Sequence, residues 1–167
     1  MLTNVNIHII VQEVISKIYD LIPTTLLDEL SAEICISKGT DNYEYMTLGS
    51  RIITSNHHKN TNECFIEKLK ILKIDNKISD ELIDIAEKHK DIIIKTIDYN
   101  KDYLFDYFSY KTLEKSYLLK NKDNKTIERI HDLIMRVSLG IHGEDIDSAL
   151  ESYIIFHLLF FIYYYIN

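Results

Sequence analysis

The sequence predicts an all-α fold, and three observations support this. Glycine and proline are rare, with four Gly and one Pro in 167 residues, whereas a β-rich chain needs many turn-forming residues. Apolar residues make up 46% of the chain, enough for a buried core, and they recur at helical spacing. Short polar runs separate these periodic segments. We therefore expect helices joined by polar loops.

The first two helices are expected on either side of Pro23. Apolar residues from about 8 to 21 predict one inward stripe, formed by Val11, Val14, Ile15, Ile18 and Ile22. Pro23 ends that helix, and Thr24 or Thr25 caps the next. The second helix is expected to face the core with Leu27, Leu30, Ile34 and Cys35.

Three more helices are expected between residues 42 and 89. The first covers 42–59 and faces inward with Tyr45, Leu48, Ile52 and Ser55. The second covers 62–72 and faces inward with Phe65, Leu69 and Leu72. Ser79 and Asp80 begin the third, which runs through His89.

The rest of the chain is also expected to be helical. After a loop near 98–101 come an aromatic-rich segment and a helix containing KTLEKSYLL, residues 111–119. The run KNKDNK at 120–125 predicts an exposed turn or short hairpin, and helices at about 130–140 and 144–160 follow. Arg136 and Glu114 are candidates for an ion pair. The expected core residues here are Leu113, Leu118, Met135, Val137 and Ile141.

Charge and composition disfavour several classes of protein. The net charge of −7 and the pI near 5.5 argue against nucleic acid as a partner, since phosphate binding requires a basic face. Cys35 and Cys64 are too few for a disulfide framework or a metal cluster. The N-terminal MLTNVNIHII lacks the features of a signal peptide. These observations favour a cytoplasmic protein with reduced thiols.

The residues alone do not predict catalysis. His57 and His58 invite a metal interpretation, but helical neighbours point about 100° apart and do not readily share one ion. His131, His142 and Asp145 are separately plausible ligands without diagnostic spacing. We therefore predict no catalytic residue and no metal site in this chain.

Four ordered runs carry a resemblance to a known family. Tyr107-Phe108 and KTLEKSYLL resemble YFGFKTLERSYLL, Glu128-Arg129 resembles the start of ERPQ, and the segment 135–153 resembles MRVSVGIHxEDIxxAxxxY. Upstream, LGSRIITSNHHKNT at 48–61 resembles LAARIxxxNLHKxT. These family patterns belong to the large subunit of class I ribonucleotide reductase, the ribonucleoside-diphosphate reductase family.

The resemblance implies a domain arrangement. Residues 1–65 would be a truncated ATP-cone, a helical allosteric module, and residues 66–153 the helical lead-in to a catalytic α/β barrel. The barrel itself is absent. Residues 154–167 depart from the family pattern as an apolar tail, which we interpret as the result of a misread gene or of a split subunit.

The resemblance also implies a nucleotide site. Thr24 and Asp28 match two family contacts for the allosteric effector ATP or dATP. Four residues apart, they share one helix face and can hydrogen-bond a base or ribose. The alternative is that Thr24 only caps the helix and Asp28 favours its first turn. The family's basic hairpin, V-x-K-R-D-G-R, has no counterpart before Val11.

The tail is not expected to span a membrane. From Tyr153 to Ile166 it is almost entirely apolar, with His157 as its polar residue. A helix of that length rises about 21 Å, short of the hydrocarbon core of about 30 Å.

The function implied is that of the N-terminal part of an enzyme that reduces ribonucleoside diphosphates for DNA synthesis. The chain has no match to the family's catalytic cysteines, so we expect it to be inactive alone. The implied partners are the small radical-generating subunit, the rest of the large subunit and a thioredoxin-like reductant, with homo-oligomers of the complete protein. The alternative is a non-enzymatic module that binds a nucleotide or a reductase subunit.

Overall fold

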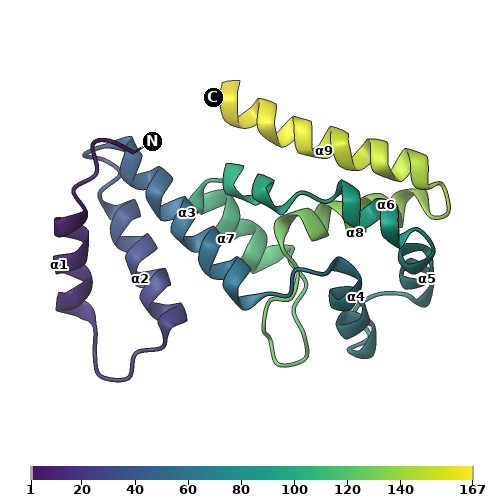
Figure 1. The fold of residues 1–167 in the computed structure, drawn as a ribbon, viewed down its shortest axis with the longest axis horizontal. Coiled ribbons are helices and arrows are strands. Elements are labelled where there is room, and N and C mark those ends of the chain that lie inside the picture. The colour runs from purple at the N-terminus through teal and green to yellow at the C-terminus, as the bar shows by residue number, and fades with distance from the viewer. Residues whose placement is uncertain (1, 167) are drawn as a thin grey trace. The chain divides into compact units, whose positions relative to one another are not determined.

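The computed structural model describes the backbone of residues 2–166 and the side chains of residues 2–159. Over this range the chain is predominantly helical, which confirms the all-α fold class (Figure 1). The elements are α1 (Ile7–Lys17), α2 (Thr24–Ser37), α3 (Tyr43–Asn60), α4 (Phe65–Ile74), α5 (Asp80–Lys88), α6 (Lys90–Thr96), the 3₁₀ helix η1 (Tyr99–Leu104), α7 (Tyr107–Ser116), α8 (Ile130–His142) and α9 (Ile146–Ile166).

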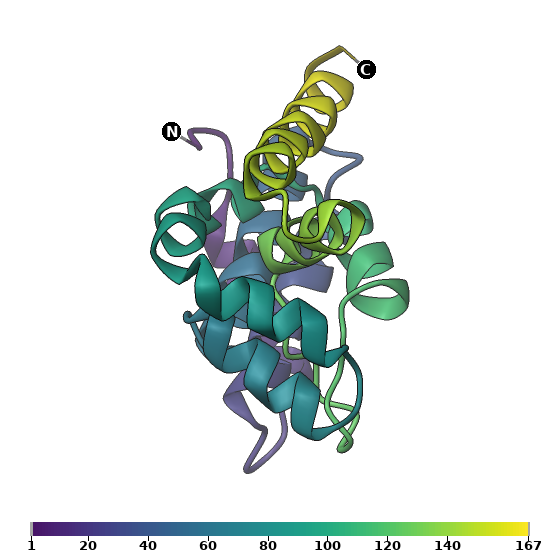
Figure 2. The same ribbon diagram turned by 90° about the vertical axis from the view of Figure 1, so that its right-hand side faces the viewer.

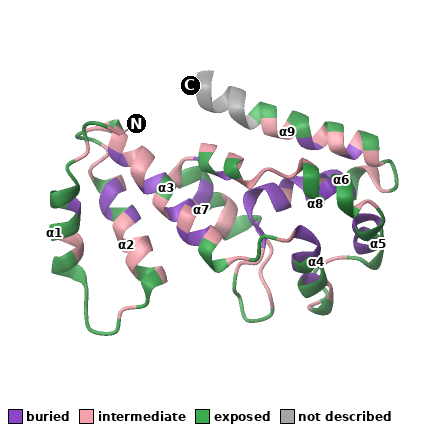
Figure 3. Cartoon of the chain, viewed as in Figure 1, coloured by how far each residue is buried: buried purple, intermediate pink, exposed green. Residues whose placement is uncertain are grey.

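The chain divides into two compact units. The first contains the residues up to Asn60 together with Phe105–Lys111, and the second contains Thr61–Leu104 together with the residues from Thr112 onward. Each unit has buried apolar side chains of its own, which Figure 3 colours purple. We therefore describe each unit separately.

The first unit is built on the packing of α2 against α3. Helix α1 lies beside α2 (Figure 1). Buried residues of α1, α2 and α3 together form the core of this unit. The buried members are Ile10, Ile34, Cys35 and Tyr45. Burial raises the pKa of the Cys35 thiol to about 11. The segment before α1 is tied to α3, since the Asn6 N–H donates to the Tyr45 hydroxyl at 2.9 Å.

Helix α1 differs from the prediction in its length and in the face that it buries. It ends at Lys17, and its predicted inward residues Val11, Ile15 and Ile18 are 46%, 60% and 42% exposed. Val14, which was also predicted to face inward, does pack against the core, together with Ile10, which was not in the predicted stripe. The sequence identified an amphipathic helix but not which edge of its broad apolar face the unit covers.

The start of α2 also differs from the prediction. Pro23, in extended conformation, is the N-cap residue, and no side chain caps the helix. Thr24 is therefore the first helical residue, and the expectation that it or Thr25 caps the helix is wrong. Proline suits this end of a helix because the missing N–H would have no intrahelical partner.

The second unit packs α4, α5, α6, α8 and α9 around a second core. Helix α8 contacts α5, η1 and α9, and both ribbon views show α9 alongside α8 (Figures 1 and 2). Phe65, Leu69 and Leu72 of α4 are buried, as predicted. The N-cap of α5 is also as predicted, because the Ser79 hydroxyl accepts from the Leu82 N–H at 3.3 Å.

Three features of the second unit refine the prediction. Helix α6 was not predicted, and η1 lies where a loop near residues 98–101 was expected. The turn at 120–125 is closed by an isolated bridge between Lys120 and Thr126, which confirms the hairpin alternative. Leu118 and Met135 are buried, as predicted, but Ile141 is 61% exposed. Ile141 lies in the last turn of α8, near the end of the helix at His142.

The predicted apolar tail continues α9 as a helix through Ile166, while Asn167 lies outside the described residues. Ile154, Ile155, Leu158 and Leu159 are each about half exposed, between 47% and 56%. Within the described residues, no helix combines the length and hydrophobicity that a membrane span requires.

The cap at Ser79 provides a test of the fold. Replacing Ser79 with Ala removes the acceptor for the Leu82 N–H, and we expect a loss of about 1 kcal/mol in the free energy of unfolding. Urea unfolding followed by circular dichroism measures this loss. Ser79→Asp is the matched control, since Asp also caps helices and should retain the stability of the wild type. Equal stability of the alanine variant would contradict the cap.

Candidate functional site

The two predicted nucleotide contacts lie at the start of α2. Thr24 is exposed in the first turn, and Asp28 is half-buried one turn later. The hydroxyl of Thr24 does not cap the helix, because α2 has no side-chain hydrogen bond at its N-terminus. This removes the capping role from Thr24 but does not by itself assign another.

A cation that the sequence reasoning missed lies beside Asp28. Lys59, near the end of α3, places Nζ 2.9 Å from Oδ2 of Asp28. The end of α3 is held near the start of α2 by Asn56, whose side-chain amide donates to the Thr25 carbonyl at 3.1 Å. Lys59 belongs to the run LGSRIITSNHHKNT, and 31 residues separate it from Asp28 in the chain. Helix pairing therefore brings a hydroxyl, a carboxylate and an ammonium into one region of the first unit.

The histidines beside Lys59 have other surroundings. His57 is buried and packs edge-on against Tyr110, with the ring centroids 5.5 Å apart. Among the residues that the structure describes, no three His, Cys, Asp or Glu side chains gather as metal ligands would. His57 thus contributes packing to the first unit.

The second unit contains a buried ion pair. Lys68 of α4 and Asp132 of α8 are 1% and 0% exposed, and the Lys68 ammonium donates to the Asp132 carboxylate. Tyr99 of η1 donates its hydroxyl proton to the other Asp132 oxygen at 2.5 Å and lies 3.1 Å from Lys68 Nζ. Burial lowers the pKa of Lys68 and raises that of Asp132, while each charge opposes the shift of the other.

Arg129 extends this network. Its backbone N–H donates to Asp132 at 2.6 Å, and its guanidinium lies 4.7 Å from the centre of the Tyr99 ring. The Arg129 side chain also donates to the Thr61 hydroxyl at 2.9 Å and to the Thr61 carbonyl at 3.1 Å. The start of α8 is therefore fixed to α4, to η1 and to the segment before α4.

Two further carboxylates are buried around α8. Glu128 accepts from the Leu119 N–H at 2.9 Å and from the Arg136 guanidinium at 3.0 Å. The predicted partner of Arg136, Glu114, is therefore wrong, because Arg136 pairs with Glu128. Asp102 accepts from the His131 N–H at 3.2 Å and also contacts its ring Nδ1.

The chemistry of this network is structural. Lys68 and Asp132 are buried and contact each other, and neither lines the pocket between α5 and α8 or the pocket beside Cys64 that the half-buried Tyr99 lines. A buried charge requires a partner of opposite sign, so these contacts fix which helices meet. The network therefore fixes the arrangement of the second unit.

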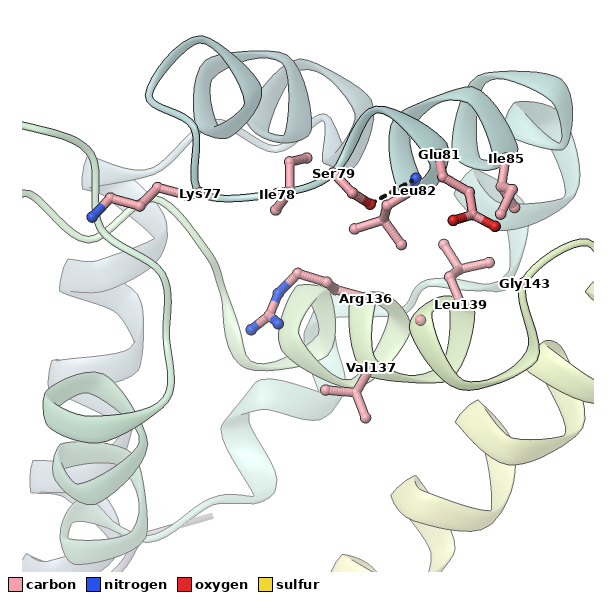
Figure 4. A pocket seen from close by; sticks show the side chains of 11 residues that line it. Lys77, Ile78, Ser79, Glu81, Leu82, Ile85, Arg136, Val137, Leu139 and Gly143 are labelled. Carbon is pink, nitrogen blue, oxygen red and sulfur yellow. Dashed lines mark hydrogen bonds between the residues drawn. The ribbon is translucent and has the colours of Figure 1, made fainter.

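A pocket of about 330 Å³ lies between α5 and α8 (Figure 4). Leu82, Ile85 and Leu139 provide apolar walls, and Ser79 lies at the start of α5. From α8, Arg136 and Gly140 also line it. The sequence reasoning did not predict this pocket.

Comparison with known proteins gives consistent matches. The model of the ribonucleotide reductase all-alpha domain matches residues 103–160. The ribonucleoside-diphosphate reductase large subunit of Plasmodium falciparum is 44% identical over 152 residues, which covers 86% of this chain and 19% of that protein. The large subunit of Caenorhabditis elegans is 46% identical over 151 residues, covering 84% and 19%. The large chain 2 of Saccharomyces cerevisiae is 39% identical over 161 residues, covering 91% and 18%.

These matches define the class of the helical fold as the all-α region of a ribonucleotide reductase. More particularly, the chain belongs to the family of ribonucleoside-diphosphate reductase large subunits and corresponds to their helical N-terminal part. It spans about a fifth of the length of the relatives that it matches.

The Lys68–Asp132 pair gives a second prediction. Lys68→Met leaves the Asp132 carboxylate buried without its cation, and we expect the free energy of unfolding to fall by about 3–5 kcal/mol. The double variant Lys68→Met, Asp132→Leu should lose less than the single variant, because no uncompensated charge remains. Urea unfolding measures both.

The matched control is Lys70→Met on the same helix. Lys70 is 46% exposed and pairs with Glu67 and Glu87 at the surface, so its loss should cost below about 1 kcal/mol. A Lys68 variant as stable as the Lys70 variant would contradict the assignment of a buried pair.

Proposed function

We propose that the chain acts in the reduction of ribonucleoside diphosphates to deoxyribonucleotides, as the helical N-terminal part of a reductase large subunit. The supporting observation is identity of 44–46% to such subunits over some 85% of the chain. In this proposal the chemistry resides in the remaining part of the large subunit. The small radical-generating subunit and a thioredoxin-like reductant complete the enzyme in the cytoplasm. The domain boundaries at residues 65 and 153 belong to the same proposal.

We further propose that the start of α2 binds the allosteric effector, ATP or dATP. Thr24 and Asp28 supply a hydroxyl and a carboxylate for the ribose or base. Lys59 supplies a positive charge for a phosphate.

The contact between Lys59 and Asp28 is compatible with ligand entry. The Lys59 side chain is 63% exposed and that of Asp28 is 29% exposed, so solvent weakens the ion pair to well under about 1 kcal/mol. A phosphate can therefore replace the carboxylate as the partner of Lys59 at little cost. Asp28 is then released to accept hydrogen bonds from the nucleotide.

The second candidate function is a non-enzymatic interaction module. The exposed apolar residues of α1 and α9 favour it, since large exposed apolar patches commonly mark contact surfaces. This module would bind a reductase subunit without contributing to turnover.

Nucleotide titration gives a third prediction. In calorimetry with the whole chain, ATP should bind, and Lys59→Gln should weaken it about tenfold through loss of a charge-assisted contact. Thr24→Ala should weaken binding without changing the melting temperature, because Thr24 does not cap α2. Lys17→Gln, an exposed lysine at the end of α1, is the control and should bind like the wild type. Absence of binding, or equal weakening in the control, would contradict the site.

Activity in a complete subunit gives a fourth prediction. We expect a chimera, in which this chain replaces the aligned part of the Caenorhabditis elegans large subunit, to reduce cytidine diphosphate when the small subunit and thioredoxin are added. The chain alone should show no turnover under the same conditions. A folded chimera without turnover would favour the non-enzymatic alternative.

A further inference from the structure

The inward face of α9 contains a histidine at its far end. Ala149, Tyr153 and His157 are four residues apart in turn, so they share one face of the helix. Ala149 and Tyr153 are 0% and 1% exposed, and His157 is half-buried. The face that α9 turns toward α8 therefore ends in a side chain whose charge can change near neutral pH.

His157 packs against a second histidine, which a carboxylate holds in place. The ring centroids of His157 and of His131 in α8 are 5.5 Å apart, and the His131 ring meets Tyr153 edge-on at 5.9 Å. Asp102 of η1 accepts from the His131 backbone N–H at 3.2 Å and contacts its ring Nδ1 at 2.5 Å. Because Asp102 fixes the buried His131 ring, His157 meets a surface with little room to adjust.

The surroundings of His157 disfavour its charged form. Burial, followed by the positive charge of Lys101 in η1 and by His131, lowers the pKa of His157 below its ordinary value of 6.5. Asp98, just before η1, acts in the opposite direction. Its carboxylate already accepts from the backbone N–H and the side-chain amide of Asn100, at 3.0 and 3.1 Å. The attraction of Asp98 is therefore shared with Asn100.

This environment couples the position of α9 to pH. When α9 lies on α8 and η1, His157 binds a proton less readily than it does in water, so protonation favours the state in which His157 is solvated. The contact is at full strength above a pH of 6.5 and weakens as the pH falls below that value. For one proton, the equilibrium changes by at most about tenfold per pH unit.

We propose that His157 is a pH-sensitive contact that holds the second half of α9, from Tyr153 onward, against α8 and η1 at neutral pH and releases it in mildly acidic solution. The proton comes from the solvent. Release of this segment uncovers Tyr153 and the His131 ring beneath it.

A second histidine defines where the release stops. His142, at the end of α8, lies 2.7 Å from the Ser152 hydroxyl through its Nε2. A hydroxyl can both donate and accept, so this contact persists whether or not His142 carries a proton. His142 therefore anchors the first half of α9 at either pH.

Amide hydrogen exchange of the whole chain tests the proposal. Rates in peptides that cover residues 153–159 of α9 and residues 133–139 of α8 are measured at a pH of about 7.5 and of about 5.5. Each rate is divided by that of an unstructured peptide at the same pH. We expect the protection of 153–159 to fall about threefold to tenfold at the lower pH, and that of 133–139 to change by less than about twofold.

Three variants assign the effect to one side chain. His157→Gln removes the proton site and should give equal protection at both pH values, whereas His157→Lys is charged at both and should give low protection throughout. His142→Gln is the matched control and should retain the pH dependence of the wild type. The proposal is overturned by a wild type without pH dependence, by a His157→Gln variant that keeps it, or by a control that loses it. Equal loss of protection in α8 would indicate general acid unfolding and would also overturn it.

Nuclear magnetic resonance gives a test that requires no variant to fold. The ring signals of His157 in the wild-type chain report its pKa directly, and we expect a value below 6.5. A value above 6.5 would overturn the proposal, because protonation would then strengthen the contact with α8 and η1.

Discussion

The second unit depends on burying one positive charge beside one negative charge. Lys68 and Asp132 come from helices that are distant in sequence, and neither tolerates an apolar interior without the other. Tyr99 and the Arg129 N–H also donate to Asp132, so the pairing of these groups requires α4, η1 and the start of α8 to meet as they do. Apolar packing alone would allow neighbouring registers, but this network does not.

Features encoded locally were predictable from the sequence. The cap at Ser79 and the inward residues of α4 follow from spacing and side-chain chemistry within a few residues. Lys68 was not predictable, because in the run FIEKLKILKI it looks like Lys70, and its burial depends on Asp132, 64 residues away. The predicted pairing of Arg136 with Glu114 was wrong for the same reason, because the contact of Arg136 with Glu128 forms only in the folded unit.

The candidate nucleotide site also combines residues that the sequence identified with one that only the fold reveals. Thr24 and Asp28 were found by resemblance to a known family, whereas Lys59 joins them only through the packing of α2 on α3. The face of α1 was misassigned because its apolar arc is broad, and only the position of α2 decides which edge is covered. Periodicity therefore identifies the helices, whereas contacts between helices determine which residues are buried and which lie side by side.

The buried thiol of the first unit has a practical consequence. Cys35 is 0% exposed, and with a pKa near 11 almost none of it is thiolate at neutral pH. An alkylating reagent can reach it only when α2 separates from its neighbours. Its reaction rate therefore gives the opening equilibrium of the first unit alone, so the chain carries its own probe of local unfolding without an added label.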